Sequence, residues 1–237
     1  METTLIDLQG TFVHQLMVII HVLLFVYWLG GDLGVFYSSK FVVRPDLSPE
    51  ARSISAKIML DLDLIPRLCM SLMLTVGGIL TEFIGVPHPW YQQIGILLLG
   101  PVWFFCVMYL HFRHGSKASA LIAKFDMFIR YAVAIGIPIS VWLHWDSNNL
   151  GDYPWIAAKL IVFAFLVFCG IKVRGKIGPF FVVLMKCRAG EVPTDEENAA
   201  QRESLSQVRV WVFMIWAGVF FEGFIGTINR SGIVYGG

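Results

Sequence analysis

The feature that most constrains the fold is an apolar stretch near the start of the chain, VHQLMVIIHVLLFVYWLGGDLGVFYSSKFVV, residues 13–43. A membrane hydrocarbon core of ~30 Å is crossed by about 20 apolar residues in a helix. This stretch is therefore long enough to span a membrane with some tilt. Polar side chains inside such a span are costly and usually serve a function, so its histidines and its aspartate are the first candidates for a site.

The composition indicates a polytopic membrane protein. Hydrophobic residues make up 57% of the chain and charged residues 15%, and the mean hydropathy is +0.68. The net charge of +1 is spread over separate links, and no basic stripe indicates a nucleic-acid partner. The four cysteines form no CxxC pair, which argues against a disulfide framework or a zinc site. The acidic start METTLIDLQG lacks a basic region, so no cleaved signal peptide is expected.

The hydropathy pattern predicts one all-α membrane domain, residues 1–237, with about six transmembrane helices. The expected spans are residues 12–42, 58–84, 91–112, 126–145, 154–173 and 207–228. The longest link, about 173–206, contains IGPFFVVLMKCR, which is too short to cross a membrane. We expect this segment to lie along the membrane surface or to re-enter it, and the residues after it to start the last helix.

The positive charges predict the orientation. Nearly all of the 18 Lys and Arg residues lie in or beside the links that follow the first, third and fifth spans. Arg230 lies on the other side, and Arg67 and Lys159 lie within spans. By the positive-inside rule those three links face the cytoplasm, and both termini face the non-cytoplasmic side.

The first span has a polar and aromatic face. At 100° per residue, His14 and His21 fall on nearly the same side of the helix, and Trp28 and Asp32 continue it. A GxxxG pair with Gly31 beside it allows close approach of another backbone or of a flat ligand. The alternative is ordinary helix packing, which the same pattern also fits.

The orientation places the polar groups at two depths. His21 and Lys159 lie in the outer half of the bilayer, and Asp32 and Arg67 lie in the inner half, where the two can meet. Lys159 either belongs to a site or reaches toward the outer headgroups. Asp63 is four residues before Arg67 and is expected to pair with it, although Arg67 is also a candidate to hold a ligand carboxylate.

These residue types favour haem. Neutral imidazole binds haem iron, and glycine leaves room for the flat macrocycle between helices. His14 and His21 are candidate ligands, and His144, at the outer end of the fourth span, is a further candidate. Copper is the alternative, since imidazole and thioether groups bind it, but MxxM-type clusters are missing from the outer links.

Three runs resemble the HemJ and CopD-like membrane proteins. In HVLLFVYWLGGDLGVFY a histidine is followed seven residues later by Trp and then by Gly and an aromatic residue, here His21, Trp28, Gly31 and Tyr37. IPRLCMSLMLTVGG is similar to the second-helix segment of the family. PWIAAKLIVFAFLVFCGIKVR is similar to the later helix that carries a functional lysine, here Lys159.

The resemblance implies haem b and oxidoreductase chemistry. HemJ-type members are similar to haem b-binding protoporphyrinogen IX oxidases, with His21 as the iron ligand and Lys159 acting on cofactor or substrate, whereas CopD-type domains are linked to copper uptake. HemJ-type proteins are expected to have four helices, so the third and fourth spans here are additions. A bacterial inner membrane is the expected location.

The leading hypothesis is a haem b-binding redox protein that oxidises a porphyrinogen-like substrate or passes electrons, with Lys159, Arg67 and Asp32 as catalytic candidates. Its expected partners are membrane lipid, haem or a porphyrin, and a redox partner or a second copy. The alternatives are copper or small-solute transport and a membrane anchor for a redox enzyme.

Overall fold

The computed structural model describes residues 5–113, 115–146 and 150–230. Within them the chain folds into seven α-helices and one short 3₁₀ helix. These are α1 (Leu5–Val42), α2 (Pro49–Glu82), α3 (Trp90–Phe112), α4 (Lys117–Leu143), η1 (Leu150–Asp152), α5 (Pro154–Lys176), α6 (Gly178–Arg188) and α7 (Asp195–Arg230). The all-α fold predicted from the sequence is confirmed.

Within the described residues, five helices are long and apolar enough to cross a membrane, as expected of an integral membrane protein. They are Gly10–Val42 of α1, Pro49–Glu82, Trp90–Phe112, Pro154–Lys176, and Asp195–Ile228 of α7. The expected span 126–145 corresponds to most of α4, which is not among these five.

Several helices begin well before the apolar spans because polar residues cap them. Ser48 and Ser116 accept hydrogen bonds from the first turns of α2 and α4. Before α7, the backbone N–H of Thr194 donates to the Glu197 carboxylate and the Thr194 hydroxyl accepts from the Glu197 N–H. This reciprocal pair is a capping box, and it starts the last helix at Asp195 rather than at residue 207.

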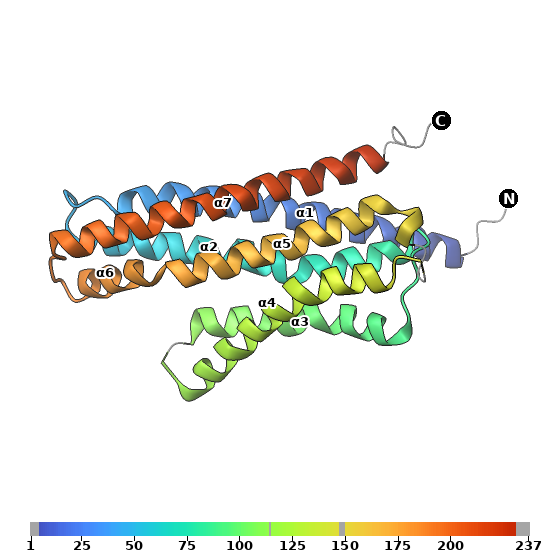
Figure 1. Cartoon of the computed structure of the whole chain (residues 1–237), viewed down its shortest axis with the longest axis horizontal. Coiled ribbons are helices and arrows are strands. Elements are labelled where there is room, and N and C mark those ends of the chain that lie inside the picture. Colours follow the sequence, from blue (N-terminus) through green and yellow to red (C-terminus); the bar gives the residue numbers. More distant parts are fainter. Residues whose placement is uncertain (1–4, 114, 147–149, 231–237) are drawn as a thin grey trace.

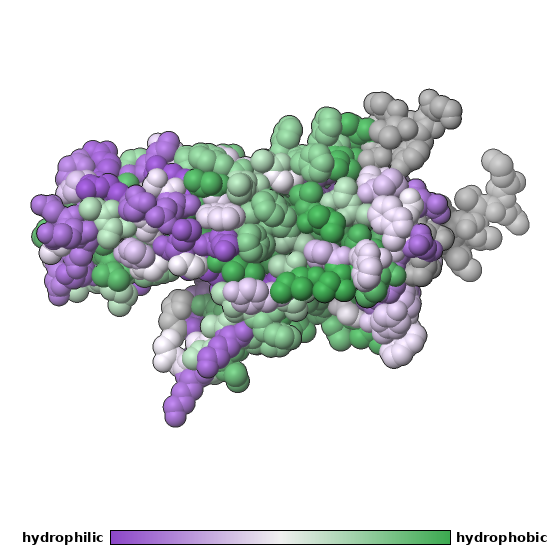
Figure 2. Space-filling model, in the orientation of Figure 1, coloured by the Kyte–Doolittle hydropathy of each residue, from purple (hydrophilic) through white to green (hydrophobic). Residues whose placement is uncertain are grey.

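The long helices form a ring in chain order. From α1 to α5 each helix packs on the one that follows it. α5 then packs on α7, and α7 packs on α1 to close the ring. Figure 1 shows that α1 begins and α7 ends at the same end of the bundle, and that α6 lies at the opposite end. The surface in Figure 2 is apolar over the middle of the bundle and hydrophilic at the α6 end.

The link expected at 173–206 is largely helical. It contains α6 and the beginning of α7, and α6 buries Phe180, Val183 and Leu184 as it packs on α2 and α7. At this end Arg52 is 3% exposed and donates to the Val42 carbonyl and to two amide side chains of α7. α6 is therefore a packed part of the bundle end.

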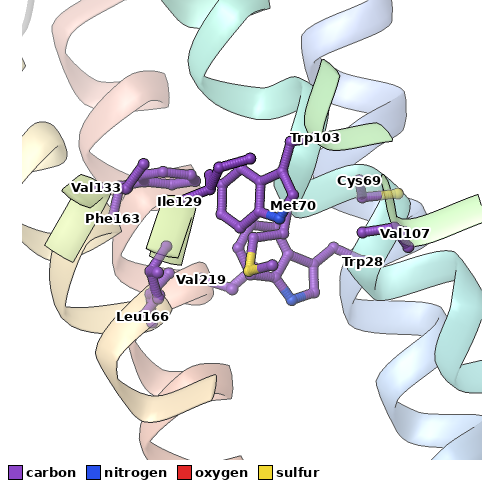
Figure 3. Close-up of a cluster of buried hydrophobic side chains, with 11 residues drawn as sticks. Trp28, Cys69, Met70, Trp103, Val107, Ile129, Val133, Phe163, Leu166 and Val219 are labelled. Carbon is purple, nitrogen blue, oxygen red and sulfur yellow. The ribbon is translucent and has the colours of Figure 1, made fainter. Parts of the chain in front are cut away.

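The middle of the ring is filled by large apolar side chains. Figure 3 shows Trp28, Met70 and Trp103 turned toward one another, with Phe163 on the α5 side of the cluster. Trp28 and Phe163 pack edge to face, with ring centroids 6.3 Å apart. These three aromatic residues and Met70, which together we call the aromatic layer, join α1, α2, α3 and α5 at mid-height.

Gly31 sets the spacing of α1 and α2. A Cβ atom at Gly31 would lie 2.7 Å from Cδ of Pro66, whereas no described atom lies within 4 Å of a Cβ at Gly30. We expect Gly31→Ala to lower the free energy of unfolding by about 1–3 kcal/mol through overpacking. Gly30→Ala is the matched control and should be neutral or stabilising, since alanine is the better helix former. Thermal unfolding in detergent measures both, and equal midpoints would contradict this close approach.

Candidate functional site

His21 points into the bundle. Its Nδ1 atom is buried and has no hydrogen-bond partner among the described residues. A Cβ at Gly77 of α2 would lie 3.6 Å from the imidazole Cε1, so the imidazole faces a glycine across the helix pair. His21 is also close enough to Lys159 of α5 for the two side chains to interact electrostatically. The sequence places these two residues at the same depth but does not predict that they approach each other.

Lys159 pairs with an acid of α7. Its Nζ lies 3.7 Å from Oε2 of Glu222, and the two side chains are only 21% and 17% exposed. The other carboxylate oxygen of Glu222 is buried without a partner in the described part of the chain. A Cβ at Gly226 would lie 3.2 Å from the lysine Nζ. We call His21, Lys159 and Glu222 the His21 centre.

A second group of charges lies nearer the α6 end. Asp126 of α4 is fully buried and lies between two arginines, with Arg130 Nε and Arg174 Nη1 each 3.0 Å from its Oδ2. The indole N–H of Trp103 donates to its Oδ1 over 2.9 Å. This arrangement ties α3, α4 and α5 together through one carboxylate.

Arg67 and Asp63 belong to the same region. As predicted, they pair within α2, with Arg67 Nε 3.0 Å from the Asp63 carboxylate. Both interact electrostatically with Arg174. Asp32 of α1 lies close to Asp63 and to the indole of Trp216. We call Asp63, Arg67, Asp126, Arg130 and Arg174 the Asp126 centre.

The aromatic layer separates the two centres along the helices. On α5 Phe163 comes between Lys159 and Arg174, and on α1 Trp28 comes between His21 and Asp32, which lies beside the Asp126 centre near Asp63. The ring therefore holds a polar group on each side of an apolar layer. Such buried charges mark functional positions in a membrane protein more often than not.

The other predicted site residues lie elsewhere. Trp28 is 4% exposed in the aromatic layer, and Gly31 packs on Pro66. His14 packs against Phe83, with ring centroids 5.1 Å apart, and lines an open depression along the side of α1. His144 follows α4 and hydrogen-bonds to Gln92 of α3 and to the Ser140 carbonyl. Neither histidine joins the His21 centre.

Sequence reasoning missed Glu222, although a signal was present. Glu222 is the one acidic residue in the expected span 207–228, and its depth from the end of that span is within one residue of the depth of Lys159 from the start of its own. Two opposite charges at one depth are expected to pair in an apolar medium. Asp126, Arg130 and Arg174 were missed because they lie near the ends of spans, where charges are commonly solvated.

Among the described residues, no group of three or more His, Cys, Asp and Glu side chains is arranged to hold a metal ion. The four cysteines are buried free thiols. No protein-family model matches the chain, and comparison with curated proteins and with solved structures gives no significant match.

Proposed function

We propose that the protein is an integral membrane redox protein that binds haem b at the His21 centre, where the imidazole of His21 would hold the iron. The observation that carries the proposal is the buried Nδ1 of His21, which lacks a partner in the described chain and lies beside Lys159. Imidazole is the common protein ligand of haem iron. Gly77 and Gly226 keep side chains away from the imidazole and from the lysine Nζ.

The three side chains have separate roles in this proposal. Haem, when bound, supplies electron transfer to or from its iron. His21 binds it, Lys159 provides a positive charge and a proton donor at Nζ, and Glu222 positions that lysine through their ion pair. The unpaired Oε1 of Glu222 is a proton acceptor within the same centre. A porphyrinogen-like donor or a redox partner would deliver the electrons.

The resemblance to HemJ and CopD-like proteins and the distribution of Lys and Arg complete the proposal. We infer six transmembrane helices, α4 included, with both termini on the non-cytoplasmic side of a bacterial inner membrane. α1 begins and α7 ends at the same side of the bundle (Figure 1), which supports this topology. A cysteine-labelling experiment on intact cells, with single reactive cysteines at residues 47 and 151, tests it.

The direct test is the reduced-minus-oxidised spectrum of protein purified after expression with haem supplied. We expect a Soret band and an α-band, and their absence would refute the proposal. Lys159→Ala should retain haem and lower its midpoint potential by on the order of tens of millivolts, because a positive charge is lost and Glu222 is left unpaired. Lys172→Ala is the control, since Lys172 lies near the Phe168 ring at the far end of α5 and should not shift the potential.

Small-solute or copper transport is the second candidate. It is favoured by the two polar centres on either side of the aromatic layer, an arrangement suited to binding a solute alternately from each side. Copper accumulation in whole cells, with and without expression of the protein, tests the copper version. An unchanged copper content would remove it.

A further inference from the structure

Two cations from different helices lie against one aromatic ring. Nζ of Lys40, in the last turn of α1, is 5.4 Å from the centroid of the Phe36 ring, and Cζ of Arg209 of α7 is 5.6 Å from the same centroid. The negative face of an aromatic ring attracts a cation within about 6 Å of its centroid. Phe36 therefore holds one positive charge from each helix where α1 packs on α7. We call Phe36, Lys40 and Arg209 the Phe36 site.

Neither cation of the Phe36 site has a counter-charge among the described residues. The ion pairs of the structure involve other side chains, and Nε of Arg209 is buried without a hydrogen-bond partner. A buried donor without an acceptor is unfavourable, and two like charges beside one ring repel each other. Lys40 is exposed and the rest of Arg209 is half-buried, so an anion outside the protein can reach both and relieve both costs.

The Phe36 site lies where the apolar stretches of the two helices end. Lys40 is near the end of α1 and Arg209 precedes the apolar stretch of α7, so both belong to the α6 end of the bundle (Figure 1). Toward the middle of the bundle, Leu33 and Phe213 are each 50% exposed, and the Phe213 ring packs on Phe36 with centroids 5.6 Å apart. Cations at headgroup depth thus adjoin exposed apolar side chains at acyl-chain depth, which is the order of groups in a phospholipid.

We propose that the Phe36 site binds the phosphate of an anionic phospholipid whose acyl chains lie along Leu33 and Phe213. The guanidinium fork of Arg209 matches the oxygens of phosphate, and the ammonium of Lys40 adds a second positive charge. Basic sites between transmembrane helices are known to hold anionic headgroups. A zwitterionic lipid carries a cation of its own, so two unpaired cations favour a lipid with net negative charge. The lipid comes from the leaflet at the α6 end, which the proposed orientation makes the cytoplasmic one.

The test uses the full chain purified in a neutral sugar detergent and freed of lipid. Its thermal unfolding midpoint is measured against increasing phosphatidylglycerol, and against phosphatidylcholine of the same acyl chains at equal ionic strength. We expect phosphatidylglycerol to raise the midpoint at lower concentration and by more than phosphatidylcholine does. Equal shifts with the two lipids, or an equal rise with inorganic phosphate alone, would overturn the proposal.

Lys40→Gln and Arg209→Gln should each weaken the binding of phosphatidylglycerol about fivefold, as expected for the loss of one cation near an anionic headgroup. Phe36→Leu keeps both charges but removes the ring that holds them, and it should also weaken binding. Lys172→Gln is the matched control, because Lys172 lies alone over the Phe168 ring, 5.0 Å from its centroid, at the same end of α5.

The control variant should bind phosphatidylglycerol with wild-type affinity. An equal loss in Lys172→Gln would mean that net charge alone attracts the lipid, and wild-type affinity in Phe36→Leu would mean that no built site exists. Either result overturns the proposal, as does wild-type affinity in Lys40→Gln. Since Lys40 is exposed, Lys40→Gln carries the test if Arg209→Gln fails to fold.

Discussion

Asp126→Asn is expected to lower the free energy of unfolding by about 3–5 kcal/mol, the cost of breaking a buried ion pair by removing one partner. The amide keeps the shape of the side chain but leaves Arg130, which is 2% exposed, without a counter-charge. It also loosens the contact of Arg174 with α4 and replaces one acceptor oxygen with a donor amide. The measurement is denaturant-induced unfolding in detergent, followed by far-UV circular dichroism.

A matched control shows whether the loss of unfolding free energy comes from the burial of the carboxylate or from the loss of a charge alone. Asp61→Asn removes a carboxylate of α2 that lies 3.6 Å from His111 Nε2 and is 55% exposed. Exposed pairs contribute about 0–1 kcal/mol, so this variant should unfold nearly as the wild type does. Adding Arg130→Gln to Asp126→Asn should restore part of the lost stability, because it removes the unpaired buried cation. Similar losses for Asp61→Asn and Asp126→Asn would show that the burial of Asp126 has no energetic role.

The parts of the site that the sequence predicts are those that follow from position along a single helix. Asp63 and Arg67 are four residues apart, so their pairing depends only on helix geometry. The shared depth of His21 and Lys159 likewise follows once the spans are placed in alternating directions, whereas their electrostatic contact depends on the packing of α1 and α5. Both predictions need only the period of a helix and the thickness of a bilayer.

The remaining parts of the site depend on which helices are neighbours, and that is a property of tertiary packing. The face that carries Trp28 and Gly31 is the same in a ligand site and in a helix–helix contact. Only the fold shows that Pro66 fills the space beside Gly31. The contact of Arg174 with Asp126 likewise requires α4 and α5 to pack side by side. The lengths of α1 and α7 escape a hydropathy analysis because their ends are polar.

Haem binding by the protein is expected to depend on His21. His21→Ala should reduce the haem content of the purified protein more than about tenfold, since loss of even an outer-shell partner of a metal ligand costs 10–100-fold in affinity. His14→Ala and His144→Ala are the matched controls, because neither side chain lies in the His21 centre, and both should keep wild-type haem content. Pyridine haemochrome assay and the height of the Soret band measure the ratio of haem to protein.

Loss of haem could also follow from a damaged fold, and a smaller substitution distinguishes the two causes. His21→Gly opens a space opposite Gly77, which free imidazole can enter to replace the missing ligand. If His21 binds iron, imidazole added during haem loading should restore the Soret band in His21→Gly. Imidazole added without haem to wild-type protein stripped of its haem should give no Soret band. A normal haem content in His21→Ala would instead place any haem away from the His21 centre. The unpaired Nδ1 and its neighbours Lys159 and Glu222 would then be better explained as a proton-linked transport site, since the same buried charges would remain without a cofactor to serve.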